Sequence, residues 1–133
     1  LYGQSYFFSE AEDVLGGEGT YGEILPGGVE KIFHTIAAMG APLGSGDAFY
    51  DLGSGVGKVV LQAYLTTQAE SSIGIELESK RHAAAVNALA SLQKMVGPST
   101  LDDFSTYAGF IRDDIRDSSV WANASVVHAS VIA

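Results

Sequence analysis

The most constraining feature of the sequence is a glycine-rich turn between an apolar run and an amphipathic segment. Residues 48–58 read Ala-Phe-Tyr-Asp-Leu-Gly-Ser-Gly-Val-Gly-Lys, with glycines at the alternate positions Gly53, Gly55 and Gly57. Glycine lets the backbone approach a ligand where a Cβ atom would clash, and a helix presents unpaired N–H groups at its start. The segment therefore predicts a strand, a tight turn and a helix, which together form the first βα corner of a nucleotide-cofactor site.

Spacing separates the candidate cofactor motifs. A P-loop needs four residues between its first glycine and a Gly-Lys pair that precedes Ser or Thr, but here Gly53 lies one residue too close to Gly57, and Val59 replaces the hydroxyl residue. A dinucleotide fingerprint needs Gly or Ala at its third position for close helix–strand packing, and that position is Lys58. An ordinary turn without a ligand is the plain alternative, although a turn alone does not need three glycines.

A third pattern matches in full. Asp51 ends the apolar run and is followed by G-x-G-x-G, which resembles motif I of the Rossmann-like class of S-adenosylmethionine-dependent methyltransferases. The resemblance implies a cofactor site that includes Asp51, Gly53, Ser54, Gly55, Gly57 and Lys58. In that site Lys58 would pair with the cofactor carboxylate, unless its side chain faces solvent.

A second acid follows the next predicted strand. Glu76 ends the run Ser72-Ile73-Gly74-Ile75 roughly twenty residues after the glycine turn, an offset at which a strand-tip carboxylate binds a ribose diol. The alternative is a solvated glutamate, which is favourable near a helix N-terminus. With the glycine motif in place, we expect Glu76 to accept hydrogen bonds from the ribose hydroxyls.

A third acidic segment follows the strand predicted at 106–111. In this methyltransferase class a carboxylate after the third strand binds the adenine amino group. The resemblance therefore implies this role for Asp114, with Asp113 as the second choice, and packing of Ile115 on the adenine ring. The alternative is an exposed acidic turn, because Asp117 extends the run of charges.

Composition narrows the class of protein. The chain has 133 residues, of which 47% are hydrophobic, and a formal net charge of −9, which suits one domain with a real core. The acidic balance argues against a self-contained nucleic-acid-binding surface and would attract a basic protein substrate.

Without cysteines or a spaced His/Asp cluster, we expect no disulfide and no metal site. No membrane-length apolar run and no secretory-type start are present, so we expect a nuclear or cytoplasmic protein, not a secreted one.

Periodicity gives the order of elements. It predicts helices at 28–39, 56–66 and 78–96, and strands at 48–52, 72–76, 106–111 and 125–129. Alternating strands and helices indicate βαβ units, a parallel sheet with flanking helices and a Rossmann-like α/β fold. Because about four strands are fewer than this class usually has and no initiator methionine is present, we expect a segment of a longer protein. We expect residues 1–27 to form an N-terminal segment with a cofactor-covering loop, and residues 28–133 to form the cofactor-binding core.

A closer resemblance rests on two segments at the expected distance from each other. Tyr21-Gly22-Glu23 and the run from Asp51 to Gln62 are similar to the Tyr-Gly-Glu-Thr and Asp-Leu-Gly-Ser-Gly-Val-Gly-Gln-Val-Val-Leu-Gln motifs of the Dot1 family of histone-lysine methyltransferases. The resemblance implies transfer of a methyl group from S-adenosylmethionine to a protein lysine, with a histone as the possible substrate in chromatin. It also implies that Tyr21 and Glu23 help to close over the cofactor.

Departures from the family pattern keep other functions open. Ile24 stands where the family has Thr, and Lys58 stands where it has Gln. After the fourth strand the family has Asn and an aromatic residue near the transferring methyl, and here Ser130 is the nearest match and the candidate catalytic residue. His128 is the histidine closest to the predicted cofactor edge. The alternatives are methylation of another protein, an RNA or a small molecule, and a non-catalytic module of the same fold.

Overall fold

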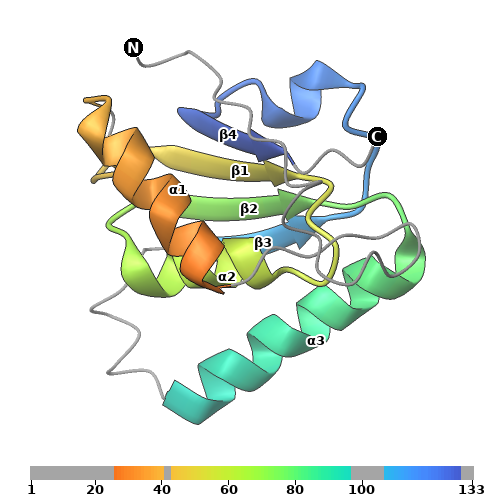
Figure 1. Ribbon diagram of the computed structural model, residues 1–133. Helices are drawn as coiled ribbons and strands as arrows, with labels where there is room; N and C mark the ends of the chain where they lie inside the picture. The colour runs from red at the N-terminus through yellow and green to blue at the C-terminus, as the bar shows by residue number, and fades with distance from the viewer. Residues whose placement is uncertain (1–25, 41–42, 97–106, 130–133) are drawn as a thin grey trace.

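The computed structural model describes residues 26–40, 43–96 and 107–129 (Figure 1). Its elements are, in chain order, α1 (Pro26–Ala38), β1 (Ala48–Leu52), α2 (Lys58–Thr66), β2 (Ser71–Ile75), α3 (Ser79–Val96), β3 (Tyr107–Ile111), a 3₁₀ helix (Ser118–Trp121) and β4 (Val126–Ala129). The predicted strands are confirmed with their ends within one residue, and the predicted helices with their ends within two. The short 3₁₀ helix follows the acidic segment, where the sequence predicted no helix.

The four strands form one parallel sheet in the order β3-β2-β1-β4. This confirms the prediction that all four strands are parallel. Because β1 has β2 on one side and β4 on the other, the strand order reverses direction at β1. In open α/β sheets such a reversal is where ligands bind, beyond the carboxyl ends of the strands.

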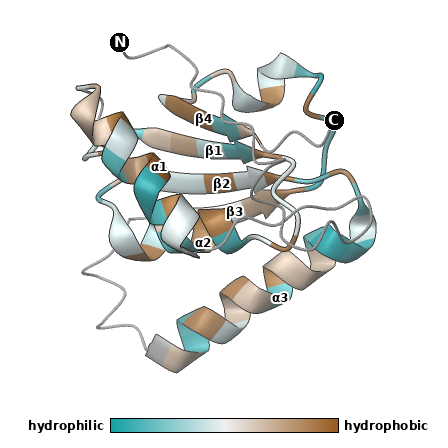
Figure 2. Cartoon of the chain, in the orientation of Figure 1, coloured by the Kyte–Doolittle hydropathy of each residue, from teal (hydrophilic) through white to brown (hydrophobic). Residues whose placement is uncertain are grey.

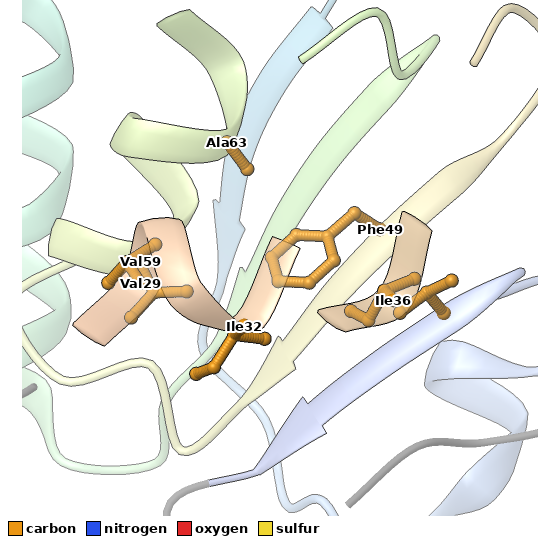
Figure 3. Packing of buried hydrophobic residues seen from close by; sticks show 7 residues of the cluster. Val29, Ile32, Ile36, Phe49, Val59 and Ala63 are labelled. Atoms are coloured by element: carbon orange, nitrogen blue, oxygen red, sulfur yellow. The ribbon is translucent and has the colours of Figure 1, made fainter. Parts of the chain in front are cut away.

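One face of the sheet packs against α1 and α2. Side chains alternate between the two faces of a strand, and the buried cluster on this face consists of Val29, Ile32, Ile36, Phe49, Val59, Ala63 and Val126 (Figure 3). The ring of Phe33 meets that of Phe49 edge to face, with centroids 5.4 Å apart, a favoured arrangement of aromatic pairs. This packing fixes α1 and α2 over β1.

The opposite face carries a second cluster. Its buried members are Ala48, Tyr50, Leu52, Ile73, Ile75, Val127 and Ala129. Val120, Trp121 and Ala124 from the region of the 3₁₀ helix pack against it.

Among the residues that the structure describes, no helix is both long enough and apolar enough to cross a membrane.

Candidate functional site

The carboxyl ends of the four strands meet at one edge of the sheet, and Figure 1 shows their arrowheads pointing to that edge. The strands are largely hydrophobic, but β1 and β4 turn hydrophilic at this end (Figure 2), where Asp51 and His128 lie. Glu76 directly follows β2 at the same edge. The topology therefore brings together the two acids that the sequence predicted for the first two strand ends.

The glycine turn that follows β1 has a conformation that favours glycine. Gly53, Gly55 and Gly57 have φ angles of 73°, 58° and 91°, in the left-handed region where a Cβ atom is disfavoured. At Gly57 a second constraint applies, because an added Cβ would lie 2.5 Å from Cζ of Phe110. Gly53, with nothing within 4 Å of an added Cβ, is thus needed for the backbone path alone, whereas Gly57 is also needed for packing against β3.

Backbone hydrogen bonds tie this turn to the end of β2. The N–H groups of Gly53 and Ser54 both donate to the carbonyl oxygen of Ile75, at 2.8 and 3.0 Å. Ser54 also packs closely on β2, because a Cβ added at Gly74 would lie 2.5 Å from Ser54 Oγ. Gly74 therefore lets the turn sit directly on the neighbouring strand, a role that the sequence did not suggest for it.

Glu76 is buried, with 7% of its surface exposed, and its side chain reaches the glycine turn. Oε1 accepts a hydrogen bond from the Gly55 N–H at 2.8 Å, and Oε2 accepts from the Glu78 N–H at 3.0 Å and from Arg81 Nη2 at 3.2 Å. An ionised carboxylate has about four acceptor positions, so these three bonds leave room for a further donor. The ribose role of Glu76 stays a prediction.

Asp51 and His128 form a buried pair on adjacent strands. They are register partners in the β1–β4 ladder, and Nδ1 of His128 lies 2.7 Å from Oδ1 of Asp51. Burial raises the pKa of the Asp51 carboxyl, while the hydrogen bond and charge of His128 oppose that rise and the nearby Glu76 charge adds to it. Each of these two acids thus has its own basic partner, His128 for Asp51 and Arg81 for Glu76.

The start of α2 completes the corner. The residue before the helix is Gly57, which has no side chain to cap the helix N-terminus. Such an end carries partial positive charge and suits an anionic group such as a carboxylate. Lys58 is the first residue of the helix and its side chain is exposed, so its predicted pairing with the cofactor carboxylate stays a prediction.

The acidic segment after β3 carries its own ion pair. Arg116 donates to both carboxylate oxygens of Asp114, with Nε at 3.0 Å from each oxygen and Nη2 at 2.6 Å from Oδ2. The Arg116 guanidinium lowers the pKa of Asp114 to about 2. The N–H of Asp114 donates to Oδ1 of Asp113 at 2.7 Å. Asp114 would therefore share its carboxylate between Arg116 and the adenine amino group. The sequence did not predict the pairing with Arg116.

Apolar side chains at the same edge are exposed. Leu77 after β2 is 58% exposed and Ile115 is 38% exposed, and Arg112 Nε donates to the Leu77 carbonyl oxygen at 3.2 Å. Trp121 Nε1 donates to the Ile115 carbonyl oxygen at 2.9 Å, so the tryptophan both packs against the core and holds the acidic segment. Exposed aliphatic groups here offer a surface for a flat aromatic ring.

Three predicted site residues, Tyr21, Glu23 and Ser130, lie outside the described residues. Among the residues that are described, no group of three or more His, Cys, Asp or Glu side chains could hold a metal ion. The structure adds Arg81 to the site, and it gives His128, which the sequence already placed near the cofactor edge, a partner in Asp51. The signal for His128 was its position near the end of the last predicted strand, whereas nothing in the sequence distinguished Arg81 from an ordinary helix-surface arginine.

Known proteins resemble this chain in sequence. The sequence matches the family described as "Histone methylation protein DOT1" over residues 15–130. A curated relative from Aspergillus fumigatus, "Histone-lysine N-methyltransferase, H3 lysine-79 specific", is 48% identical over 56 residues, which are 42% of this chain and 10% of the relative. The chain thus matches only a small part of that relative's length.

A solved structure shares the fold. An RNA methyltransferase from Salinibacter ruber in complex with S-adenosyl-L-homocysteine superposes with a TM-score of 0.64 at 21% sequence identity. The match covers 83% of this chain and 61% of that one. This likeness shows the fold, which is the Rossmann-like methyltransferase fold that the sequence predicted.

Proposed function

Because this chain belongs to the Dot1 family of histone methylation proteins, we propose that it forms the cofactor-binding core of an S-adenosylmethionine-dependent methyltransferase acting on a protein lysine. The observation that carries the proposal is the hydrogen bond from the Gly55 N–H to the buried Glu76 carboxylate. It places an acid against a glycine turn at the point where the sheet order reverses. That combination suits a ligand with a ribose and a charged tail.

In this proposal each part of S-adenosylmethionine has a group of described residues assigned to it. Glu76 would accept hydrogen bonds from the ribose hydroxyls, and the glycine turn would let the backbone approach the methionine portion. The N-terminus of α2 would face the carboxylate, and Asp51 would face the ammonium group. Asp114 and Ile115 would contact the adenine amino group and ring. When bound, the cofactor supplies a methyl group already activated by its sulfonium.

The contribution of this chain to catalysis is therefore positioning. Holding donor and acceptor in line removes most of the entropic cost of a bimolecular step. A lysine acceptor must lose its proton before it attacks, and a dry channel favours the neutral amine. His128 is not a base for that proton, because its side chain is fully buried and its Nδ1 contacts Asp51. Ser130 remains our candidate for a residue near the transferred methyl.

A histone-like substrate in the nucleus is supported by family membership and by charge. The formal net charge of −9 favours a basic partner such as a histone over the phosphate backbone of a nucleic acid. The name of the Aspergillus fumigatus relative specifies a histone lysine, and we carry that specificity to this chain as part of the proposal. RNA methylation is the second candidate, because the structural neighbour acts on RNA according to its title.

A methyl-transfer assay on the full-length protein tests the proposal. Radiolabelled S-adenosylmethionine is offered with nucleosomes, free histones or total RNA, and we expect label on a histone lysine that is lost in Glu76→Ala. The matched control is Glu70→Ala, which removes an exposed acid just before the other end of β2. Label on RNA alone would contradict the protein-lysine assignment. Calorimetric binding of NAD without any binding of S-adenosylmethionine or S-adenosylhomocysteine would contradict the cofactor assignment.

A further inference from the structure

A histidine without exposed surface contacts the acid of the glycine motif across two neighbouring strands. Asp51 and His128 are opposite each other in the β1–β4 ladder, and their side chains are 4% and 0% exposed. Nδ1 of His128 lies 2.7 Å from Oδ1 of Asp51, and at a pH above the raised pKa of Asp51 the ionised carboxylate can only accept, so Nδ1 is then the donor. The pair is therefore a directed interaction with little access for water.

Such a carboxylate needs compensation, because burial disfavours its charged form. Both burial and the charge of Glu76 raise the pKa of Asp51, and the group that opposes them is His128. On α3, Arg81 pairs with Glu76 instead. The other charged or titratable side chains of α1 and α2 are exposed, apart from the buried phenol of Tyr64. The exposed ones are Glu30, Lys31, His34 and Lys58.

We propose that His128 is a positioning residue for the cofactor site, which holds Asp51 through Oδ1 so that the ionised carboxylate is presented to a cationic ammonium group of the ligand. The inference rests on the proposed function, because it assigns Asp51 to the ammonium end of S-adenosylmethionine. The other carboxylate oxygen of Asp51, Oδ2, takes no part in the bond to His128. The histidine itself does not need to contact the cofactor.

A purely structural role for the pair makes a different prediction. If His128 only joined β4 to β1, its replacement would change the free energy of unfolding but not the affinity of the folded protein. If it positions and ionises Asp51, its replacement weakens ligand binding and shifts the pH dependence of binding. Without His128 the pKa of Asp51 rises further, so binding should require a higher pH.

The test measures S-adenosylhomocysteine binding to the full-length protein by calorimetry from about pH 5 to about pH 8. Urea unfolding at each pH confirms that the folded state is populated. For His128→Phe we expect binding weaker by roughly tenfold or more at neutral pH, since a hydrogen bond to a charged group is lost, and we expect its pH profile to move upward. His128→Asn keeps a donor near the position of Nδ1 and should restore most of the affinity.

The outcomes separate this inference from the proposed function. If the parent protein binds the ligand and His128→Phe binds equally well with the same pH profile, the positioning role is wrong while the cofactor assignment stands. If the parent protein itself binds neither S-adenosylhomocysteine nor S-adenosylmethionine, the proposed function is wrong and this inference is withdrawn with it.

A second pair of variants covers the case in which His128→Phe does not fold. Asn carries its amide donor near the position of Nδ1, whereas Gln carries it near the position of Nε2. The proposal requires His128→Asn to bind more tightly than His128→Gln. Equal affinities in these two variants would overturn it.

Discussion

Glu76 accepts a hydrogen bond from the backbone N–H of Gly55 at 2.8 Å, so the acid that ends β2 is joined to the turn that follows β1. The same carboxylate accepts from the Glu78 N–H at the start of the next segment and from Arg81. One side chain thus links two successive βα corners. The residue predicted to bind the ribose also has a structural role in shaping the turn.

Replacement of Glu76 should separate these roles. Glu76→Ala should weaken S-adenosylhomocysteine binding by roughly tenfold or more, because a charge-assisted hydrogen bond to the ribose is worth about 1.5–3 kcal/mol. Glu76→Gln retains an acceptor for the Gly55 N–H and should lose less. Calorimetry on both variants, with Glu70→Ala as the matched acid-to-alanine control, measures the difference. Parent-like affinity in Glu76→Ala would remove Glu76 from the site.

Substitutions in the glycine turn should differ according to the surrounding space. Gly53→Ala introduces a Cβ at a positive φ where nothing lies within 4 Å, whereas Gly57→Ala meets the Phe110 ring and Ala85 as well. The first should cost about 1–2 kcal/mol of stability for the backbone conformation, and the second should cost about 1–3 kcal/mol more for overpacking. Urea unfolding measures both.

A smaller side chain at Phe110 provides the control. In the Gly57→Ala background, Phe110→Leu should recover part of the added cost, because the ring carries the atoms nearest to the new Cβ. The same Phe110→Leu change in the Gly53→Ala background should not recover stability. Equal costs for the two alanine variants would show that the Phe110 contact does not restrict this position.

Stability should fall as pH rises through the raised pKa of Asp51. Burial raises this pKa above its ordinary value of 3.8, so the folded state retains a proton that the unfolded state has released. The stabilising contribution is fully present below the unfolded value and is lost as pH passes the folded one. In Asp51→Asn this pH-dependent loss of stability should be absent. The difference in free energy of unfolding, variant minus parent, should therefore increase with pH. A constant difference across the pH series would contradict the assignment.

The contribution of the Asp114–Arg116 ion pair to stability should change with pH in the opposite direction. The pKa of Asp114 is lowered to about 2, so the stabilisation from this pair is present above the ordinary value of 3.8 and is lost as pH falls through about 2. The Arg116 side chain is largely exposed, so salt should screen the pair and Arg116→Ala should change stability little.

NMR titration of the Asp114 carboxyl checks this pair directly. In Arg116→Ala the pKa of Asp114 should return toward its ordinary value. Asp114→Asn should weaken cofactor binding more than Arg116→Ala, because only the former alters the group predicted to accept from the adenine amino group. The reverse order would favour Asp113 as the adenine residue.

Local pattern was sufficient for the strands, the helices and the two principal acids. The G-x-G-x-G turn, the strand that ends at Glu76 and the helical spacing of α1 all depend on neighbours within a few residues, and such short-range periodicity is legible in a sequence. The parallel sheet followed from the alternation of elements. The division at residue 27 and the roles of all the predicted site residues, those of Asp51, Glu76 and Asp114 included, remain predictions.

The partners of the acids were decided by tertiary structure. His128 lies 77 residues from Asp51 in sequence, and it becomes a neighbour only because β4 joins the sheet beside β1 instead of extending it beyond β3. Phe110 likewise restricts Gly57 only once β3 and the turn are brought together. The sequence by itself determined which residues carry charge at the ends of strands, whereas the strand order determined which charges face each other, because burial and distance set their pKa values and depend on the assembled sheet.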